Sequence, residues 1–349
     1  CSNRKIIQND SHQSPGAGTV EFNGGAQTLP AIATFKNLTL SGSGLKTINA
    51  STATTISGNF NMSGSATTTT KMTTLSGNMS VTGTAQATLG AAVTVTGTLT
   101  VGSGAMVTTG AFAFGVTGTT DVTGTLTLTS NTGTKTFTGL ITVNSAGTLD
   151  GASTNINIAA GIANSGTVSI TGTVTMNTAG AVFSGSNAIG ITTLTVTSPG
   201  TVTNNGIVTI AIAGAFTGTG GWTQGAGSTL NTGGSTTSAM AVTTVDFTTN
   251  ANTVNYNRTG AQTLKVANYH HLTLSGTSAK TATGVTTVNG DLTVSGTATI
   301  TTLITAIGGN VIVSGGTLTT GASVTVTGST TVSSGSLVMG ALFNYTTAS

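Results

Sequence analysis

This chain has very few charged residues. Charged residues make up 4% of its 349 residues, against roughly 25% in an average globular protein. There are 3 prolines and 1 cysteine, and aromatic residues account for 4%. A single cysteine excludes an internal disulfide, and few charges combined with few prolines are unlike a typical disordered chain. We therefore expect an ordered chain that folds with little contribution from charge.

The few charged residues also do not cluster. Nine Lys and Arg stand against six Asp and Glu, giving a formal net charge of +3, and only Arg4 and Lys5 are adjacent basic residues. Nucleic-acid binding needs a basic stripe that neutralises several phosphates, so no nucleic-acid partner is expected. The sequence has no run of about 18 apolar residues, so no membrane-spanning helix is predicted.

What the chain does contain is a glycine that returns about every twenty residues. We call these the landmark glycines, and within each of two series they are separated by 19 to 21 residues. The two series are Gly58, Gly77, Gly97, Gly118 and Gly139, and then Gly290, Gly309 and Gly328. A fixed period of this length indicates a solenoid, in which each repeat buries its apolar face only by stacking on the next repeat.

The second and fourth positions after the landmark glycines are apolar in fourteen of sixteen cases. Alternation with a period of two is typical of a strand with one buried face. These side chains are therefore predicted to point inward and to stack on their equivalents in the next coil. The predicted inward stack consists of Phe60, Met62, Met79, Val81, Leu99, Val101, Ile141, Val143, Leu292, Val294, Val311 and Val313.

Val and Thr are frequent between these positions, and both favour strands because their branched side chains suit a pleated surface. Helix signals are nearly absent. The sequence therefore predicts an all-β fold, a parallel β-solenoid of about 16–17 coils with roughly 19–21 residues per coil. The landmark glycines are placed at coil corners, where glycine is expected to supply the positive φ that a tight turn needs.

The pattern also predicts how the chain is organised. Residues 1–16 lack it and are predicted to form a polar N-terminal arm or, alternatively, a disordered leader. A single solenoid is predicted over 17–349, with an irregular middle at about 145–250. Two blocks, 19–66 and 253–298, share Gly-Ala-Gln-Thr-Leu, Leu-Thr-Leu-Ser-Gly and an aligned lysine, Lys46 in one and Lys280 in the other. They indicate a duplication of several coils.

The sequence TVNYN…GAQTL…LTLSG…TTVNGDLTVSG, together with WTQGAGSTLN at 222–231, resembles the repeats of large secreted bacterial surface proteins. Those repeats are adhesin-like and are predicted to form β-solenoids. The resemblance covers most of the chain from residue 17 onward. It implies a scaffold located outside the cell, at the bacterial surface, and it implies no particular activity because such repeats mostly serve as scaffolding.

Residues that could carry catalysis are sparse. General acid–base catalysis needs paired groups, and no two acids are close in sequence, so no enzyme activity and no cofactor is expected. The acids are Asp10, Glu21, Asp121, Asp150, Asp246 and Asp291.

His270 and His271 are adjacent and form the polar pair that most suggests a metal site in the sequence. Adjacent residues of a strand point to opposite faces, so the two imidazoles are not expected to chelate one ion. No catalytic, cofactor-binding or metal site is predicted.

Ice binding is an alternative suggested by many Thr-x-Thr sequences, such as Thr98-Leu99-Thr100. A flat ice-binding face would need the same residue at equivalent outward positions of every coil. The position after the landmark glycine holds Asn59, Asn78, Thr98, Thr119, Leu140, Asp291, Asn310 and Ser329. The third position after it holds Asn61, Ser80, Thr100, Asp121, Thr142, Thr293, Ile312 and Thr331. Both series are mixed, as on a generic polar surface, which argues against ice binding.

The chain begins Cys1-Ser2-Asn3, which resembles the start of a mature bacterial lipoprotein. This resemblance implies a lipidated Cys1 that anchors the protein to the outer membrane through a short polar tail. The alternatives are an intermolecular disulfide and an unreactive thiol.

The repeat continues to the C-terminus, where Gly328 is followed by 21 residues without a helix cap. An open strand edge invites pairing, and head-to-tail contacts propagate into filaments. The leading hypothesis is a structural subunit of an extracellular bacterial filament or matrix fibre that assembles with copies of itself. The alternative is a lipid-anchored adhesin or stalk. The predicted subunit contacts are Ile6, Ile7, Leu337, Val338, Leu342, Phe343 and Tyr345.

Overall fold

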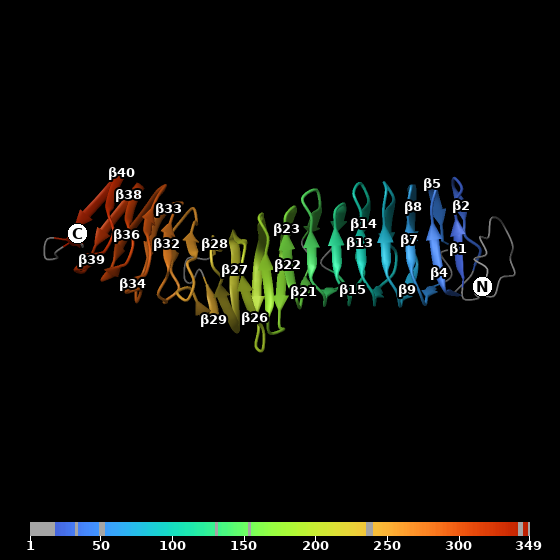
Figure 1. Ribbon diagram of the computed structural model, residues 1–349, viewed down its shortest axis with the longest axis horizontal. Helices are drawn as coiled ribbons and strands as arrows, with labels where there is room; N and C mark the ends of the chain where they lie inside the picture. Colours follow the sequence, from blue (N-terminus) through green and yellow to red (C-terminus); the bar gives the residue numbers. More distant parts are fainter. Residues whose placement is uncertain are drawn as a thin grey trace. The chain divides into compact units, whose positions relative to one another are not determined.

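The structure is a computed structural model that describes residues 18–31, 34–48, 53–129, 132–152, 155–234, 240–340 and 345–347. Every element assigned in these residues is a β-strand, and none of them forms a helix that could cross a lipid bilayer. The chain divides into two compact units, Cys1–Val174 and Thr175–Ser349. Within each unit, Figure 1 shows strands stacked as successive layers. The predicted parallel β-solenoid is confirmed, with coils of about 20 residues and about 15 turns.

Each coil of the first unit contributes one strand to each of three parallel faces. The first face contains β1 (Thr19–Phe22), β4 (Asn37–Leu40), β7 (Phe60–Met62), β10 (Met79–Val81), β13 (Leu99–Val101), β16 (Thr120–Val122), β19 (Ile141–Val143) and β22 (Gly161–Asn164). The second face contains β2 (Gln27–Thr28), β5 (Ser43–Thr47), β8 (Ser65–Thr70), β11 (Gln86–Leu89), β14 (Met106–Thr108), β17 (Thr125–Thr127), β20 (Thr148–Gly151) and the start of β23 (Thr167–Met176). The third face contains β3 (Thr34–Phe35), β6 (Thr54–Ile56), β9 (Met72–Leu75), β12 (Val93–Val95), β15 (Phe114–Val116), β18 (Lys135–Phe137) and β21 (Ile156–Ile158).

The second unit is also a parallel solenoid, and we number its faces by the duplicated blocks, in which β30 (Thr253–Tyr256) corresponds to β1. The first face contains β30, β32 (His271–Leu274), β35 (Leu292–Val294) and the starts of β38 (Val311–Thr320) and β40 (Thr330–Met339). The second face contains β31 (Gln262–Thr263), β33 (Thr277–Thr281), β36 (Thr297–Thr302) and the ends of β38 and β40. The third face contains β34 (Thr287–Val288), β37 (Ala306–Ile307), β39 (Val324–Val326) and β41 (Tyr345–Thr347).

The coils between these and the unit boundary include two long strands, of 9 and 18 residues, in the stretch expected to be irregular. They contain β24 (Ala181–Ser184), β25 (Ala188–Val196), β26 (Thr201–Asn204), β27 (Ile207–Gln224), β28 (Thr229–Thr232) and β29 (Ala241–Asp246). The register between β25 and β27 shifts between Ile191 and Thr193, and that between β27 and β29 shifts between Gly218 and Gly221. Such bulges bend a strand locally, so one long strand turns a corner without a loop.

The core of each unit is a set of aligned inward rows. All twelve residues of the predicted inward stack are buried, and none exposes more than 1% of its surface. Met79 pairs in register with Phe60 on one side and Leu99 on the other, so like positions lie on one another along the stack. Burying an aliphatic or aromatic side chain of this size contributes roughly 1.5–3 kcal/mol, and the stack repeats that contribution in every coil.

The landmark glycines are required for a reason other than the expected one. None of them has positive φ; that conformation occurs at another corner, between the first and second faces, at Gly42, Gly64, Gly83 and Gly104 and at Gly276, Gly296, Gly316 and Gly335. A Cβ on any landmark glycine would instead lie within 3.0 Å of the preceding coil. Glycine is needed there because the backbones of neighbouring coils approach too closely for a side chain.

Candidate functional site

The most regular polar feature of the first unit is a ladder at the corner that precedes the first face. The backbone N–H of Asn59 donates to the Oδ1 atom of Asn37 at 2.8 Å, and the N–H of Asn78 donates to Asn59 Oδ1 at 2.9 Å. The N–H of Thr98 donates to Asn78 Oδ1 at 2.9 Å. Each side chain therefore accepts from the backbone of the next coil and supplies a corner donor with a partner.

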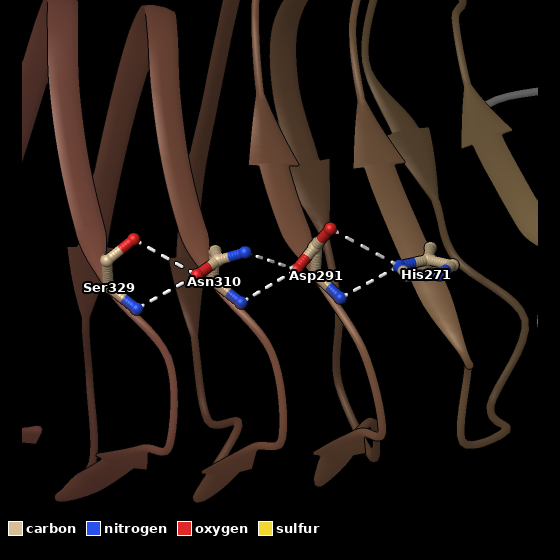
Figure 2. Close-up of polar contacts among 4 residues, drawn as sticks. All are labelled: His271, Asp291, Asn310 and Ser329. Atoms are coloured by element: carbon tan, nitrogen blue, oxygen red, sulfur yellow. Dashed lines mark hydrogen bonds and ion pairs between the residues drawn. The ribbon is translucent and has the colours of Figure 1, made fainter. Parts of the chain in front are cut away.

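The second unit has the same ladder with different side chains (Figure 2). His271 Nδ1 accepts from the N–H of Asp291 at 2.9 Å, and Asp291 Oδ1 accepts from the N–H of Asn310 at 2.7 Å. Asn310 Oδ1 then accepts both the N–H and the hydroxyl of Ser329, at 2.9 and 3.0 Å. Asp291, Asn310 and Ser329 each directly follow a landmark glycine. His271 occupies the position in the second block that Asn37 occupies in the first.

The ladder explains why glycine precedes its members. A Cβ on Gly97 would meet Asn78 Oδ1, and a Cβ on Gly309 or Gly328 would meet Asp291 Oδ1 or Asn310 Oδ1, each within 3.0 Å. The glycine thus leaves room for the acceptor of the preceding coil. In the described residues after Thr98, the equivalent positions hold Thr119 and Leu140, which lack an amide or carboxylate oxygen.

His271 is held as an acceptor. Because Nδ1 receives a backbone N–H, the neutral imidazole carries its proton on Nε2. Nδ1 also lies 3.6 Å from Asp291 Oδ2, with about a third of each side chain exposed, 34% and 33%. The rings of His270 and His271 are not on opposite faces as expected but meet edge to face, with centroids 4.7 Å apart. The alternation rule does not apply here because β32 begins at His271 and His270 lies outside the strand.

The chemistry available to the ladder is that of hydrogen bonding between coils. The Ser329 hydroxyl donates to an amide oxygen, so in this geometry it has neither an imidazole nor a carboxylate to activate it as a nucleophile. No group of three or more His, Cys, Asp or Glu residues that could hold a metal occurs in the described ranges. Two further acids also bind polar neighbours one coil away, Glu21 with Ser41 at 2.7 Å and Asp121 with Asn144 at 2.7 Å.

Comparisons with known proteins add no family. No family model, curated protein or solved structure matches the chain. The structure itself shows the repetitive parallel β-solenoid that the resemblance to bacterial surface repeats implies. Secretion, an adhesin-like nature and a lipidated cysteine are supported by none of these comparisons.

Sequence reasoning missed a second polar feature, a set of buried lysines. Lys46 is fully buried, and its Nζ donates to the carbonyls of Gly24 and Gly25 at 2.7 and 2.6 Å and to Gln27 Oε1 at 2.9 Å. Lys280, 2% exposed, donates in the same way to the Arg258 carbonyl at 2.8 Å and to Gln262 Oε1 at 3.2 Å. The signal was the shared lysine of the two blocks, but its inward direction is not visible in the sequence.

Burial lowers the pKa of these lysines. Desolvation lowers the pKa of Lys46 and of Lys135, whose Nζ donates to three backbone carbonyls, among them Gly133 at 3.0 Å. Burial and, secondarily, the nearby charge of Arg258 lower the pKa of Lys280 to about 8. Each ammonium nevertheless has oxygen acceptors at a coil corner, and two of these, the carbonyls of Gly24 and Arg258, also accept a backbone N–H. The lysines fasten one coil to the backbone of another.

The remaining residues singled out from the sequence lie mainly near the chain ends. Leu337 is half-buried and Val338 is 46% exposed, both in β40. Tyr345 lies in β41. The lipidation candidate Cys1 and the predicted contacts Ile6, Ile7, Leu342 and Phe343 lie outside the described residues.

Proposed function

We propose that the protein is a structural subunit of an extracellular bacterial filament or matrix fibre in which solenoids stack end to end with copies of themselves. The single observation that carries the proposal is the surface of β40. Val332 and Met339 occupy inward rows there, in register with Val313 and Thr320, yet they are 47% and 55% exposed. Their equivalents one coil earlier are 0% and 5% exposed.

A further coil could stack on this surface and pair with β40. β40 pairs with β38 along one edge, and its inward apolar rows have no cover among the described residues. A further coil with the same alternation, offered by another copy, would bury Val332 and Met339 and pair the strand edge. Because such a contact joins two different surfaces, it repeats from copy to copy.

The polar features support a mechanical role. The ladders and the buried lysines bind one coil to the next through backbone groups, so they hold the stack together. The proposal includes no catalytic activity and no cofactor. It places the protein outside the cell, as the resemblance to surface repeats implies.

Negative-stain electron microscopy of the purified chain over a range of concentrations tests the proposal. Wild type is expected to form filaments, and the double variant Val332→Asp, Met339→Asp is expected to remain as single particles because it buries two charges at the joint. Val266→Asp is the matched control, since Val266 is 65% exposed outside the inward rows. It should form filaments like the wild type.

Single particles of wild type at every concentration would contradict the filament and favour the alternative of a surface adhesin or stalk. Equal loss of filaments in the Val266→Asp control would show that the β40 surface is not the joint. Circular dichroism of each variant establishes that the solenoid has formed before the particles are compared.

A further inference from the structure

The first described coil, formed by β1, β2 and β3, leaves inward residues partly uncovered. Val20 and Phe22 of β1 and Gln27 of β2 are half-buried. Val20 and Phe22 belong to inward rows, because they pair in register with Leu38 and Leu40, which are both 0% exposed. We call Val20, Phe22 and Gln27 the first-coil surface.

The second block of the duplication contains the same three positions in a covered state. Its counterparts of the first-coil surface are Val254, Tyr256 and Gln262, which are 0%, 0% and 1% exposed. The preceding coil covers them through β28, in which Leu230 pairs in register with Val254 and Thr232 with Tyr256. The Thr232 carbonyl also accepts from Gln262 Nε2 at 2.7 Å. The duplication thus shows what covers such a surface, a parallel coil with two inward residues in register and a carbonyl beside the glutamine.

Gln27 has a donor that its own block does not use. Its Oε1 accepts from the backbone N–H of Gly24 at 3.0 Å and from Lys46 Nζ at 2.9 Å. Its Nε2 has no hydrogen-bond partner in the part of the chain that the structure describes. The same atom of Gln262 donates to the preceding coil. A covering coil would therefore supply the first-coil surface with a carbonyl acceptor as well as with apolar contact.

The exposed surface of β40 has the required positions. Following the register from strand to strand, Thr330 lies in the same inward row as Leu230, and Val332 lies in the same row as Thr232. Val332 is also 47% exposed. Stacked on β40 in this register, a first-coil surface would cover Val332 with its phenyl ring and would offer its glutamine amide to the Val332 carbonyl.

The outward side chains at such a joint are compatible as well. Thr331 is exposed on β40, and the same register places it opposite Glu21 of a stacked first coil. Glu21 already accepts a hydroxyl from Ser41, one coil further on, at 2.7 Å. The Thr331 hydroxyl would donate to it from the other side, and no acid of β40 would face this carboxylate.

We infer that the first-coil surface of one copy binds the exposed surface of β40 on another copy, head to tail. This inference rests on the proposed filament and adds to it the surface that each copy presents to β40. A contact between two β40 surfaces would instead be isologous and would stop at two copies, whereas the head-to-tail contact repeats.

Two variants that block opposite surfaces test the joint by sedimentation velocity. Val20→Asp alters the first-coil surface and leaves β40 intact, whereas the double variant Val332→Asp, Met339→Asp alters β40 and leaves the first-coil surface intact. Each alone is expected to sediment as a single copy, because each would bury charge at the joint. An equimolar mixture of the two should give particles of two copies, because one joint forms and growth then stops.

Thr19→Asp is the matched control. Thr19 is exposed on the same strand and pairs in register with the ladder residue Asn37, and the ladder accommodates an aspartate at Asp291. This variant should form filaments like the wild type. Gln27→Glu keeps an oxygen for Lys46 and removes the Nε2 donor, so it should raise the protein concentration needed for filaments about tenfold.

The outcomes separate this inference from the filament itself. Circular dichroism of each variant first establishes that the solenoid has formed. If wild type forms filaments, then filaments or two-copy particles of Val20→Asp alone, or a mixture that stays as single copies, would overturn the head-to-tail joint and leave the filament in place. Wild type that forms no filaments would contradict both.

Discussion

The duplicated blocks 19–66 and 253–298 use one backbone plan with different side chains. Both have a buried lysine that binds a glutamine and backbone carbonyls, Lys46 with Gln27 and Lys280 with Gln262. The ladder that begins at Asn37 in one block begins at His271 in the other. Contacts that fasten coil to coil are thus maintained, while the chemical identity of an acceptor varies.

The aromatic core shows a coordinated change between the same blocks. Phe22 and Phe35 in the first block correspond to Tyr256 and Tyr269 in the second. The two buried tyrosine hydroxyls bind each other at 2.7 Å, and Tyr269 also donates to the Lys265 carbonyl at 2.6 Å. A buried hydroxyl needs a partner, so the two positions carry compatible residues in each block.

The largest effect is expected from the landmark glycines that follow the two blocks, Gly77 in the first unit and Gly309 in the second, where the two units should behave alike. Gly77→Ala and Gly309→Ala each place a Cβ within 3.0 Å of the preceding coil's backbone. Overpacking at such a site is expected to lower the free energy of unfolding by about 3 kcal/mol. Gly25→Ala is the control, because no atom lies within 4 Å of its added Cβ. Denaturant titration followed by circular dichroism measures the difference; wild-type stability in Gly77→Ala would refute the close approach.

Substitution of the buried lysine should destabilise the protein more in the first block than in the second. Lys46→Met removes the ammonium from three oxygen acceptors, of which the Gly24 carbonyl and Gln27 Oε1 keep a backbone N–H, and it is expected to cost about 2 kcal/mol. Lys280→Met should cost about half as much, roughly 1 kcal/mol, because it also removes the repulsion from Arg258. The same titrations measure both, with the exposed Lys36→Met as control. A larger loss in Lys280→Met than in Lys46→Met would contradict this order.

The dependence of the free energy of unfolding on pH should show the contribution of Lys280 in the second block. The folded pKa of Lys280 is about 8, below the ordinary value of 10.5, so between these values the unfolded chain binds more protons than the folded one. Stability should therefore rise as the pH increases from about 8 to about 9.5, by at most about 1.4 kcal/mol per pH unit from this group. The gain should be smaller in Lys280→Met. Equal pH slopes in the two proteins would show that Lys280 is not the source.

The smallest effect is expected at the first member of the second ladder. His271→Asn should change stability by less than about 0.5 kcal/mol, because an asparagine accepts the N–H of the next coil at Asn37. His271→Ala removes the acceptor and should cost about 1 kcal/mol. Denaturation of the two variants side by side is the measurement. Equal stabilities would mean that the Asp291 N–H does not depend on this side chain.

Much of the fold could be predicted because a solenoid repeats a local pattern. The alternation after each landmark glycine places Phe60, Met79 and Leu99 inward, and they are buried. The candidate site was less predictable. The glycines were expected to provide positive φ, whereas they provide space for the preceding coil, since that approach involves residues about twenty positions away. The direction of Lys46 was also hidden, because its partners Gly24 and Gly25 belong to another coil.

The sequence by itself determined the all-β class, the coil length of about twenty residues, the inward rows and the duplication, because alternation and period are local properties of a strand. Only the tertiary structure decided which outward residues share a row. Thr281, Thr301 and Thr319 are 20 and 18 residues apart, so a count at fixed spacing from one glycine does not align them. Stacking of the inward side chains sets that register, and turns of unequal length absorb the difference.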